Sequence, residues 1–400
     1  LSSAASDVYK RQACAFGGVV SEHLYKQLAR IHELMDDEKY DQALKRLRTV
    51  RPSKKRSYEQ ALVFQTYGYL YAAQEKYPQA IEALVQCLAL KSLPESASKN
   101  TWYTLAQLQN SVADYRAAIV SLEQWFAMEK RPTPQSHAFA GMVYAQAGQF
   151  APAIDHLNKA IASTGDVEES WYRRLLSVYY DAKDYQAASQ LLEVMTQRFP
   201  GRKSYWLQLS HVYRTLKDDA RSLAVWELAY QSGLLNDEQE LVDLAGYYRY
   251  MDMPHKAGKL LQEALADGRV SQTGKHWRLL SDAWLSAREE PLARKALERA
   301  AALTSEPALY LRLAELSAQT NDWSAVLQAV DRALRLDGLK HPGRAHILKA
   351  SAHYHRQEYK AAKASFECAR EYAAVRDQAQ KWLDYLTFET MMAENSPVEY

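Results

Sequence analysis

The sequence predicts an all-α protein, built as an array of about ten helix-turn-helix units and closed by a C-terminal capping helix. Three observations support this fold class. Residues 171–200 show the pattern of two short amphipathic helices joined by a polar turn. The same pattern recurs along most of the chain at intervals of 33 to 38 residues. With 27 tyrosines and 9 tryptophans but only 14 glycines and 12 prolines, the composition is typical of packed helices rather than of disorder.

Residues 171–200 illustrate the repeating unit. Its first helix carries apolar residues at i, i+3, i+4 and i+7, beginning at Tyr172, and its second helix does the same from Ala188. The polar stretch 181–185 supplies the turn, and Pro200 with Gly201 ends the unit. Because short isolated helices are marginal in water, one such hairpin cannot bury its apolar face alone. The unit therefore requires neighbouring copies.

A small or apolar residue on the second helix, which we call the anchor, locates each copy. A tyrosine, phenylalanine or tryptophan precedes it by three residues in seven of the ten units, with Tyr185 before Ala188 as the example. So many coincidences at one period predict a tandem repeat. The ten anchors are Ala43, Ala80, Ala118, Ala153, Ala188, Ser222, Ala257, Ala293, Val326 and Ala362.

The two ends depart from the repeat. Residues 1–20 begin without methionine and resemble an artefact of sequencing followed by a signal-peptide remnant, with Cys14 in a small-x-small context. Residues 21–392 are predicted to form the repeat domain, with a capping helix over 375–391, and residues 393–400 a flexible tail. Cys87 and Cys368 fall on predicted helices, where we expect both to be buried.

Composition excludes several function classes. Fifty basic and 48 acidic side chains give a net charge of +2, so no bulk electrostatic signal indicates a nucleic-acid partner. No apolar run approaches the roughly 18–20 residues of a membrane span.

No motif for catalysis, a metal or a cofactor stands out. Residues 268–275 look like a phosphate-binding loop, but the spacing between Gly268 and Gly274 is one residue too long and His276 replaces the required hydroxyl. His353 and His355 lie on opposite sides of a predicted helix and cannot share a metal. We therefore predict that the chain is not an enzyme, with no catalytic residues, no metal site and no cofactor.

Two stretches resemble the tetratricopeptide repeat (TPR), whose pattern is Trp-x2-Leu-Gly-x2-Tyr followed by Tyr-x2-Ala. Residues 64–71 with Tyr77 and Ala80 follow it closely, and residues 206–213 follow its first part. This resemblance covers about residues 24–370. It implies a right-handed α-solenoid of about ten TPR units, with the first helices lining a concave groove and a protein or peptide partner bound there.

In the TPR geometry, groove-facing positions lie about eight, eleven and fifteen residues before each anchor. One predicted group of partner-binding residues at these positions is basic, and a second is aromatic and polar. The first comprises Arg173, Tyr180, His211, Arg214, Arg249, Arg278 and Asp282, and the second Tyr69, Tyr103, Gln107 and Asn110.

The arginines suit an anionic or C-terminal peptide segment, because guanidinium pairs with carboxylate in fork geometry. The equally weighted alternative is that they pair with acids on neighbouring helices. Leu28 and His32 occupy the places where chaperone-binding TPR proteins carry a carboxylate clamp, so a cochaperone role is disfavoured.

The chain is also similar to the exported TPR proteins associated with bacterial TonB energy-transduction systems. The similarity lies in residues 21–34, 65–72, 170–172, 183–185, 233–235 and 283–288. It implies a periplasmic adaptor that serves a TonB-dependent uptake system and contacts TonB-complex components. Two alternatives remain: a cytoplasmic scaffold or regulator, and a repeat appendage of an enzyme. The sequence predicts no oligomeric state.

Overall fold

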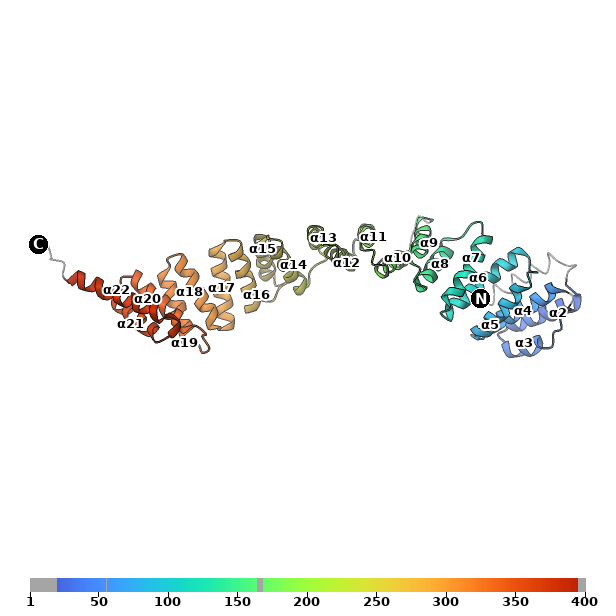
Figure 1. The fold of residues 1–400 in the computed structure, drawn as a ribbon, viewed down its shortest axis with the longest axis horizontal. Coiled ribbons are helices and arrows are strands. Elements are labelled where there is room, and N and C mark those ends of the chain that lie inside the picture. Colours follow the sequence, from blue (N-terminus) through green and yellow to red (C-terminus); the bar gives the residue numbers. More distant parts are fainter. Residues whose placement is uncertain (1–19, 55, 164–167, 395–400) are drawn as a thin grey trace. The chain divides into compact units, whose positions relative to one another are not determined.

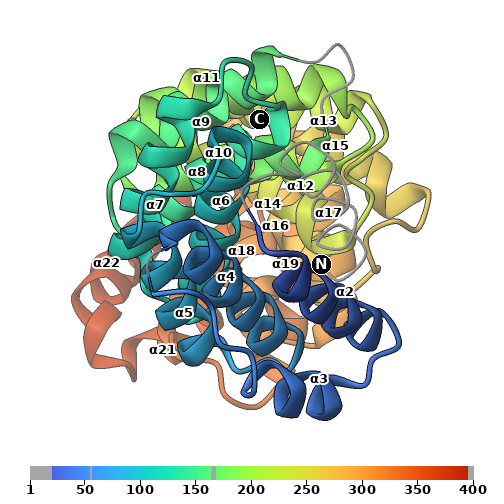
Figure 2. The same cartoon turned by 90° about the vertical axis from the view of Figure 1, so that its right-hand side faces the viewer.

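The computed structural model describes residues 20–54, 56–163 and 168–394, and every regular element in these ranges is helical (Figures 1 and 2). The predicted artefact and signal remnant, with Cys14, lies outside the described residues apart from residue 20. The contacts divide the chain into two compact units, Leu1–Arg198 and Phe199–Tyr400. The predicted all-α repeat fold is confirmed.

Unit 1 consists of five consecutive helix pairs within its described residues. The helices are α2 (Glu22–Asp36), α3 (Tyr40–Leu47), α4 (Ser57–Ala73), α5 (Tyr77–Ala89), α6 (Glu95–Ser111), α7 (Tyr115–Met128), α8 (Pro134–Gln146), α9 (Phe150–Ala162), α10 (Glu169–Asp181) and α11 (Tyr185–Arg198). Each even-numbered helix packs on the odd-numbered helix that follows it.

Unit 2 continues the pattern with five more pairs and a cap. Its described helices are α12 (Lys203–Thr215), α13 (Asp219–Gln231), α14 (Glu238–Tyr250), α15 (Pro254–Ala266), α16 (Gly274–Ser286), α17 (Glu290–Thr304), α18 (Pro307–Gln319), α19 (Trp323–Arg335), α20 (Pro342–His355), α21 (Tyr359–Arg370), η1 (Ala373–Val375) and α22 (Arg376–Glu394). Helix α22 packs on α21, as expected for a capping helix.

All ten anchor residues have 0% exposed surface, as expected for residues between the helices of a pair. In the second and fourth pairs, a glycine of the first helix lets the two helices come close together. A Cβ atom added to Gly141 would lie 2.6 Å from Cγ of Leu157, and one added to Gly68 would overlap the side chain of Leu84. Only glycine lets the two helices pack at these positions.

The turn within each pair has one backbone geometry that the sequence does not reveal. The residue five before the anchor has a left-handed conformation in all ten pairs, and only Gly148 among these residues is a glycine. The next residue's N–H donates to the carbonyl nine before the anchor, at 2.8 to 3.0 Å. This bond closes the end of each first helix in the manner of a Schellman motif. The chain thus accepts a strained residue in nine turns to keep one hairpin geometry.

Replacing Ala113 by glycine is expected to raise the free energy of unfolding by up to about 1 kcal/mol. Ala113 has φ of 59°, a conformation that non-glycine residues adopt at a penalty of roughly 1–2 kcal/mol, partly offset by the greater freedom of glycine in the unfolded chain. Ala113→Val should destabilise, because a β-branched residue suits this conformation worse. Urea titration of both variants measures the two shifts, and a glycine variant less stable than the parent would contradict this account of the turn.

Two expectations about cysteines and the tail are corrected. Cys87 is buried, and burial raises the pKa of its thiol to about 12. Cys368 is exposed, because it occupies the solvent side of α21 while Phe366 and Ala369 face the core. Helix α22 extends to Glu394, so the first two residues of the predicted flexible tail are helical; residues 395–400 lie outside the description.

Candidate partner-binding site

The three rows of predicted groove positions differ in accessibility. No residue eight before an anchor is buried in the second to tenth pairs, and both Arg214 and Arg249 in this row are exposed. In contrast, the row fifteen before the anchor includes the buried residues Gln65, Ala138, Leu311 and Ile347. That row therefore serves packing in part, and the eight-before row is the better guide to open surface.

A hollow of about 880 Å³ lies in unit 2 between α12, α13 and α14. It combines aromatic rings with charges of both signs. The residues that line it are Arg214, Lys217, Asp219, Trp226, Asp243, Gly246, Tyr247 and Tyr250. Helix α12 contributes the first, the following turn the second, and α13 and α14 the rest. We call this hollow the α12–α14 pocket.

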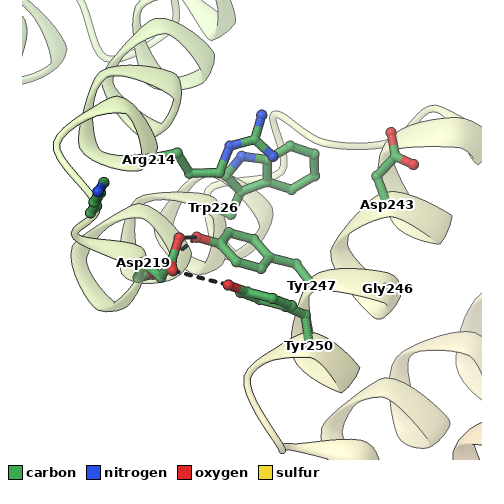
Figure 3. Close-up of a pocket in the computed structure, with 8 residues that line it drawn as sticks. Arg214, Asp219, Trp226, Asp243, Gly246, Tyr247 and Tyr250 are labelled. Atoms are coloured by element: carbon green, nitrogen blue, oxygen red, sulfur yellow. Dashed lines mark hydrogen bonds between the residues drawn. The ribbon is translucent and has the colours of Figure 1, made fainter.

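Two tyrosines of α14 hold Asp219 at the start of α13 (Figure 3). The Tyr247 hydroxyl donates to the Asp219 carbonyl at 3.0 Å and approaches its Oδ1 at 3.4 Å, while the Tyr250 hydroxyl donates to Oδ2 at 3.3 Å. Burial raises the pKa of Tyr247, so its hydroxyl stays a donor at neutral pH. The Asp219 carboxylate is thus engaged by neutral donors of the protein.

The two cations of the α12–α14 pocket are accessible to a ligand. Arg214 and Lys217 are exposed, and within the described residues neither makes a hydrogen bond or an ion pair through its side chain. The nearby Asp218 pairs with another residue instead of with these two cations. Its carboxylate accepts from Arg221 Nε at 2.6 Å and caps α13 by accepting from the Arg221 backbone N–H. These contacts hold the pKa of Asp218 below its usual value. The pocket therefore offers two cations to an incoming anion.

The remaining unit 2 residues of the predicted site lie outside this lining. Asp282 forms an ion pair with Arg312 at 2.8 Å, an arginine that is not among the predicted site residues. His211, Arg249 and Arg278 are exposed. Of the five predicted residues in unit 2, the pocket includes Arg214 alone.

In unit 1, Tyr69 and Tyr103 are partly buried rather than free. The Tyr69 hydroxyl lies among Thr101, Thr104 and Gln65, and burial raises its pKa. The Tyr103 ring packs against Trp125 and Phe139, with centroids 4.9 and 5.7 Å away. Both rings therefore contribute to packing between repeats.

The other unit 1 residues of the predicted site remain accessible to different degrees. Gln107, Asn110 and Tyr180 are partly buried, and Arg173 is exposed. Tyr180 lies edge-on to Tyr185 at 6.4 Å, and burial raises its pKa. The lining of the α12–α14 pocket includes neither Arg173 nor Tyr180.

A histidine pair in unit 1 was not anticipated from the sequence. Nδ1 of His137 on α8 and Nδ1 of His156 on α9 are 2.9 Å apart, so one ring must donate and the other accept. Phe126 stacks near both rings, at 5.2 and 4.8 Å, and Tyr144 stacks on His156. Burial, followed by the neighbouring His137, lowers the pKa of His156 to about 4, and burial also lowers that of His137. The pair is therefore neutral at physiological pH.

Unit 1 is expected to lose stability as the pH falls from 6.5 towards 4. Because the folded-state pKa of His156 lies below 6.5, the unfolded chain binds more protons in this window, and protonation favours unfolding. Buried His32, with a pKa also lowered to about 4, acts in the same direction. His156→Phe should reduce the pH dependence of the urea midpoint. Aspartate and glutamate side chains titrate alike in the variant and the wild type, so the difference between the two proteins reports the histidine pair. An unchanged dependence would show that the pair does not carry it.

The histidines, the 268–275 segment and the helix hydrophobicity bear on metal, phosphate and membrane binding. Among the described residues, no three His, Cys, Asp or Glu side chains gather closely enough to hold a metal ion. His353 pairs with Glu358 at 2.6 Å, whereas His355 stacks on Trp323. Residues 268–273 connect α15 to α16, as expected for a linker. Gly274 begins α16 and packs against Thr304. None of the described helices combines the length and hydrophobicity that a bilayer span requires.

Three comparisons relate this chain to known proteins. No protein-family model matches the sequence, and no curated protein matches it either. Among solved structures, MamA is similar at 17% identity and a TM-score of 0.32, covering 50% of this chain and 97% of its own. A tetratricopeptide repeat protein from Parabacteroides merdae is similar at 12% identity and a TM-score of 0.34, covering 65% of this chain and 99% of its own. The Naa15/Naa10 structure bound to HypK-THB is similar at 14% identity and a TM-score of 0.48, covering 92% of this chain and 66% of the matched chain. The structure itself, with ten helix pairs in the described residues and one buried anchor in each, is an all-α helical-repeat fold.

Proposed function

We propose that this chain is a non-catalytic protein–protein interaction adaptor that binds a segment of its partner in the α12–α14 pocket. The observation that carries the proposal is a pair of exposed cations beside an aromatic lining, Arg214 and Lys217, whose side chains have no hydrogen-bond or ion-pair partner among the described residues. Accessible charges next to exposed aromatic rings are typical of surfaces that select a complementary segment.

The chemistry of the pocket favours an anionic segment, either acidic side chains or a C-terminal carboxylate. The Arg214 guanidinium can pair with a carboxylate through two parallel N–H···O bonds, and Lys217 adds a second positive charge. Trp226 and Tyr250 provide apolar faces for an adjoining side chain. The carboxylates of Asp219 and Asp243 oppose the anion, but both already accept hydrogen bonds from neutral groups, Asp219 from Tyr250 and Asp243 from Gln239.

Photo-crosslinking tests whether the α12–α14 pocket contacts a partner. A photoreactive phenylalanine analogue replaces Tyr250, which is 71% exposed in the pocket, or Tyr359, which is 48% exposed outside it. The first protein should crosslink to an acidic or C-terminal segment of a partner in cells of origin, and the second should not. Identical products from both positions, or a basic segment at position 250, would contradict the proposal.

We further propose, on the sequence similarity described above, that the adaptor serves a TonB-dependent uptake system in the periplasm. A cytoplasmic scaffold or regulator is the alternative. Fractionation of cells that express the full gene, followed by affinity purification, separates the two. A periplasmic protein that co-purifies with TonB-complex components supports the first, and a cytoplasmic protein without them supports the second.

A further inference from the structure

A second hollow, distinct from the α12–α14 pocket, lies at the C-terminal cap of unit 2. It has a volume of about 310 Å³ and is lined by Tyr354 of α20 and by Lys381, Trp382 and Tyr385 of α22. Tyr354 is the residue eight before the last anchor, in the row that remains open along the repeats. We call this hollow the α20–α22 hollow.

Three aromatic rings form its walls. The Trp382 centroid lies 5.4 Å from that of Tyr354 and 5.8 Å from that of Tyr385, and the Trp382 and Tyr385 rings are inclined by 89°. Behind Trp382, the buried Phe366 stacks almost parallel at 5.5 Å and fixes the indole in place. Tyr385 nevertheless remains 44% exposed. The hollow is therefore a rigid aromatic surface that solvent reaches.

The polar groups around the rings define what can bind. The Tyr385 hydroxyl donates to Glu389 at 3.0 Å, and the Tyr354 hydroxyl lies 3.5 Å from that of Tyr385, so both hydroxyl protons have acceptors within the protein. In contrast, the indole N–H of Trp382 and the ammonium of Lys381 donate to no described residue. The hollow thus offers donors and few acceptors, and the charge of Lys381 disfavours a cationic occupant.

We propose that the α20–α22 hollow binds a proline-rich, extended segment of a partner protein. Proline presents an apolar ring that packs on aromatic faces and a carbonyl that accepts hydrogen bonds, but it has no backbone N–H that would need an acceptor. A polyproline II segment is already extended before it binds, so little conformational entropy is lost on a shallow surface. A volume near the lower end of the range for ligand pockets, about 300–1,000 Å³, suits one or two such rings.

Fluorescence polarisation with a labelled octaproline peptide and the full chain tests this proposal. The wild-type protein should bind octaproline and not a glycine–serine peptide of equal length. Tyr385→Ala should weaken binding about tenfold or more, as expected for an aromatic contact residue, whereas Tyr385→Phe, which keeps the ring, should bind like wild type. Phe388→Ala is the matched control, because Phe388 is 61% exposed on the same helix but outside the lining.

Several outcomes would overturn the proposal: no octaproline binding, equal binding of the glycine–serine peptide, or equal weakening by Phe388→Ala and Tyr385→Ala. Preferential binding of a proline-free acidic peptide would also do so, by assigning the hollow to an anionic segment. Arg214→Glu with Lys217→Glu should leave octaproline binding unchanged. The proposal for the α20–α22 hollow is thereby tested independently of the proposal for the α12–α14 pocket. Circular dichroism establishes that each variant remains folded.

Discussion

Phe366→Ala is expected to destabilise the C-terminal repeats of unit 2 by about 3–5 kcal/mol. Phe366 is completely buried, and its ring stacks on Trp382 with an angle of 7° between the planes. It joins Leu383 and Leu386 of the capping helix to the last repeat. Alanine would remove both the apolar contacts and the support of the capping helix, and the surrounding helices can fill the space only in part.

Urea unfolding followed by helical circular dichroism measures this loss. Phe388→Ala, an exposed phenylalanine on the capping helix, is the control and should change stability by no more than about 0.5 kcal/mol. Since repeats couple mainly to their neighbours, the Phe366 variant should unfold first near α20 to α22, which hydrogen exchange would detect. Equal stability of the two variants would mean that α22 does not stabilise the last repeat.

Arg214→Glu combined with Lys217→Glu is expected to abolish partner binding, with a loss of about 100-fold or more. The two substitutions turn two attractive interactions with an anionic segment into repulsive ones. Like charges in contact weaken the binding free energy by several kcal/mol. Both side chains are exposed and form no hydrogen bond or ion pair with a described residue. The helical circular dichroism signal should therefore stay unchanged.

Arg249→Glu combined with Arg278→Glu is the matched control for that variant. It changes the net charge by the same amount and alters arginines that lie outside the pocket lining. It should bind within about threefold of the wild type, because neither side chain lines the pocket and exposed charges that do not contact a ligand add little to its affinity. If both double variants lost binding equally, a diffuse basic face rather than the α12–α14 pocket would be the binding surface.

The repeat was predictable because its packing leaves a residue pattern. Every anchor inferred from the spacing is completely buried, since only a small or compact residue fits where two helices come closest. The left-handed turn residue was not predictable. Glycine usually marks that conformation, but Glu75, Lys183 and Arg288 adopt it here because the hydrogen bond that follows fixes the turn.

The site was predictable only in part. The eight-before row led to Arg214, yet it gave no reason to separate Arg214 from Arg249. Lys217 lies in a turn, Trp226 on a second helix, and Tyr247 and Tyr250 ten and seven residues before their anchor, so no single row joins them. Their proximity depends on how α12, α13 and α14 pack, which residue spacing does not encode.

A charge-swap measurement tests the central proposal most directly. The partner segment identified by crosslinking is synthesised in its natural form and with its acidic residues replaced by lysine, and titrated against the wild type and the Arg214→Glu, Lys217→Glu variant. We expect the wild type to bind only the natural segment and the variant to bind the lysine form, which restores the charge pairs across the α12–α14 pocket. Failure of the variant to gain affinity for the lysine form, or equal binding of both segments by the wild type, would contradict the proposal that this pocket recognises an anionic segment.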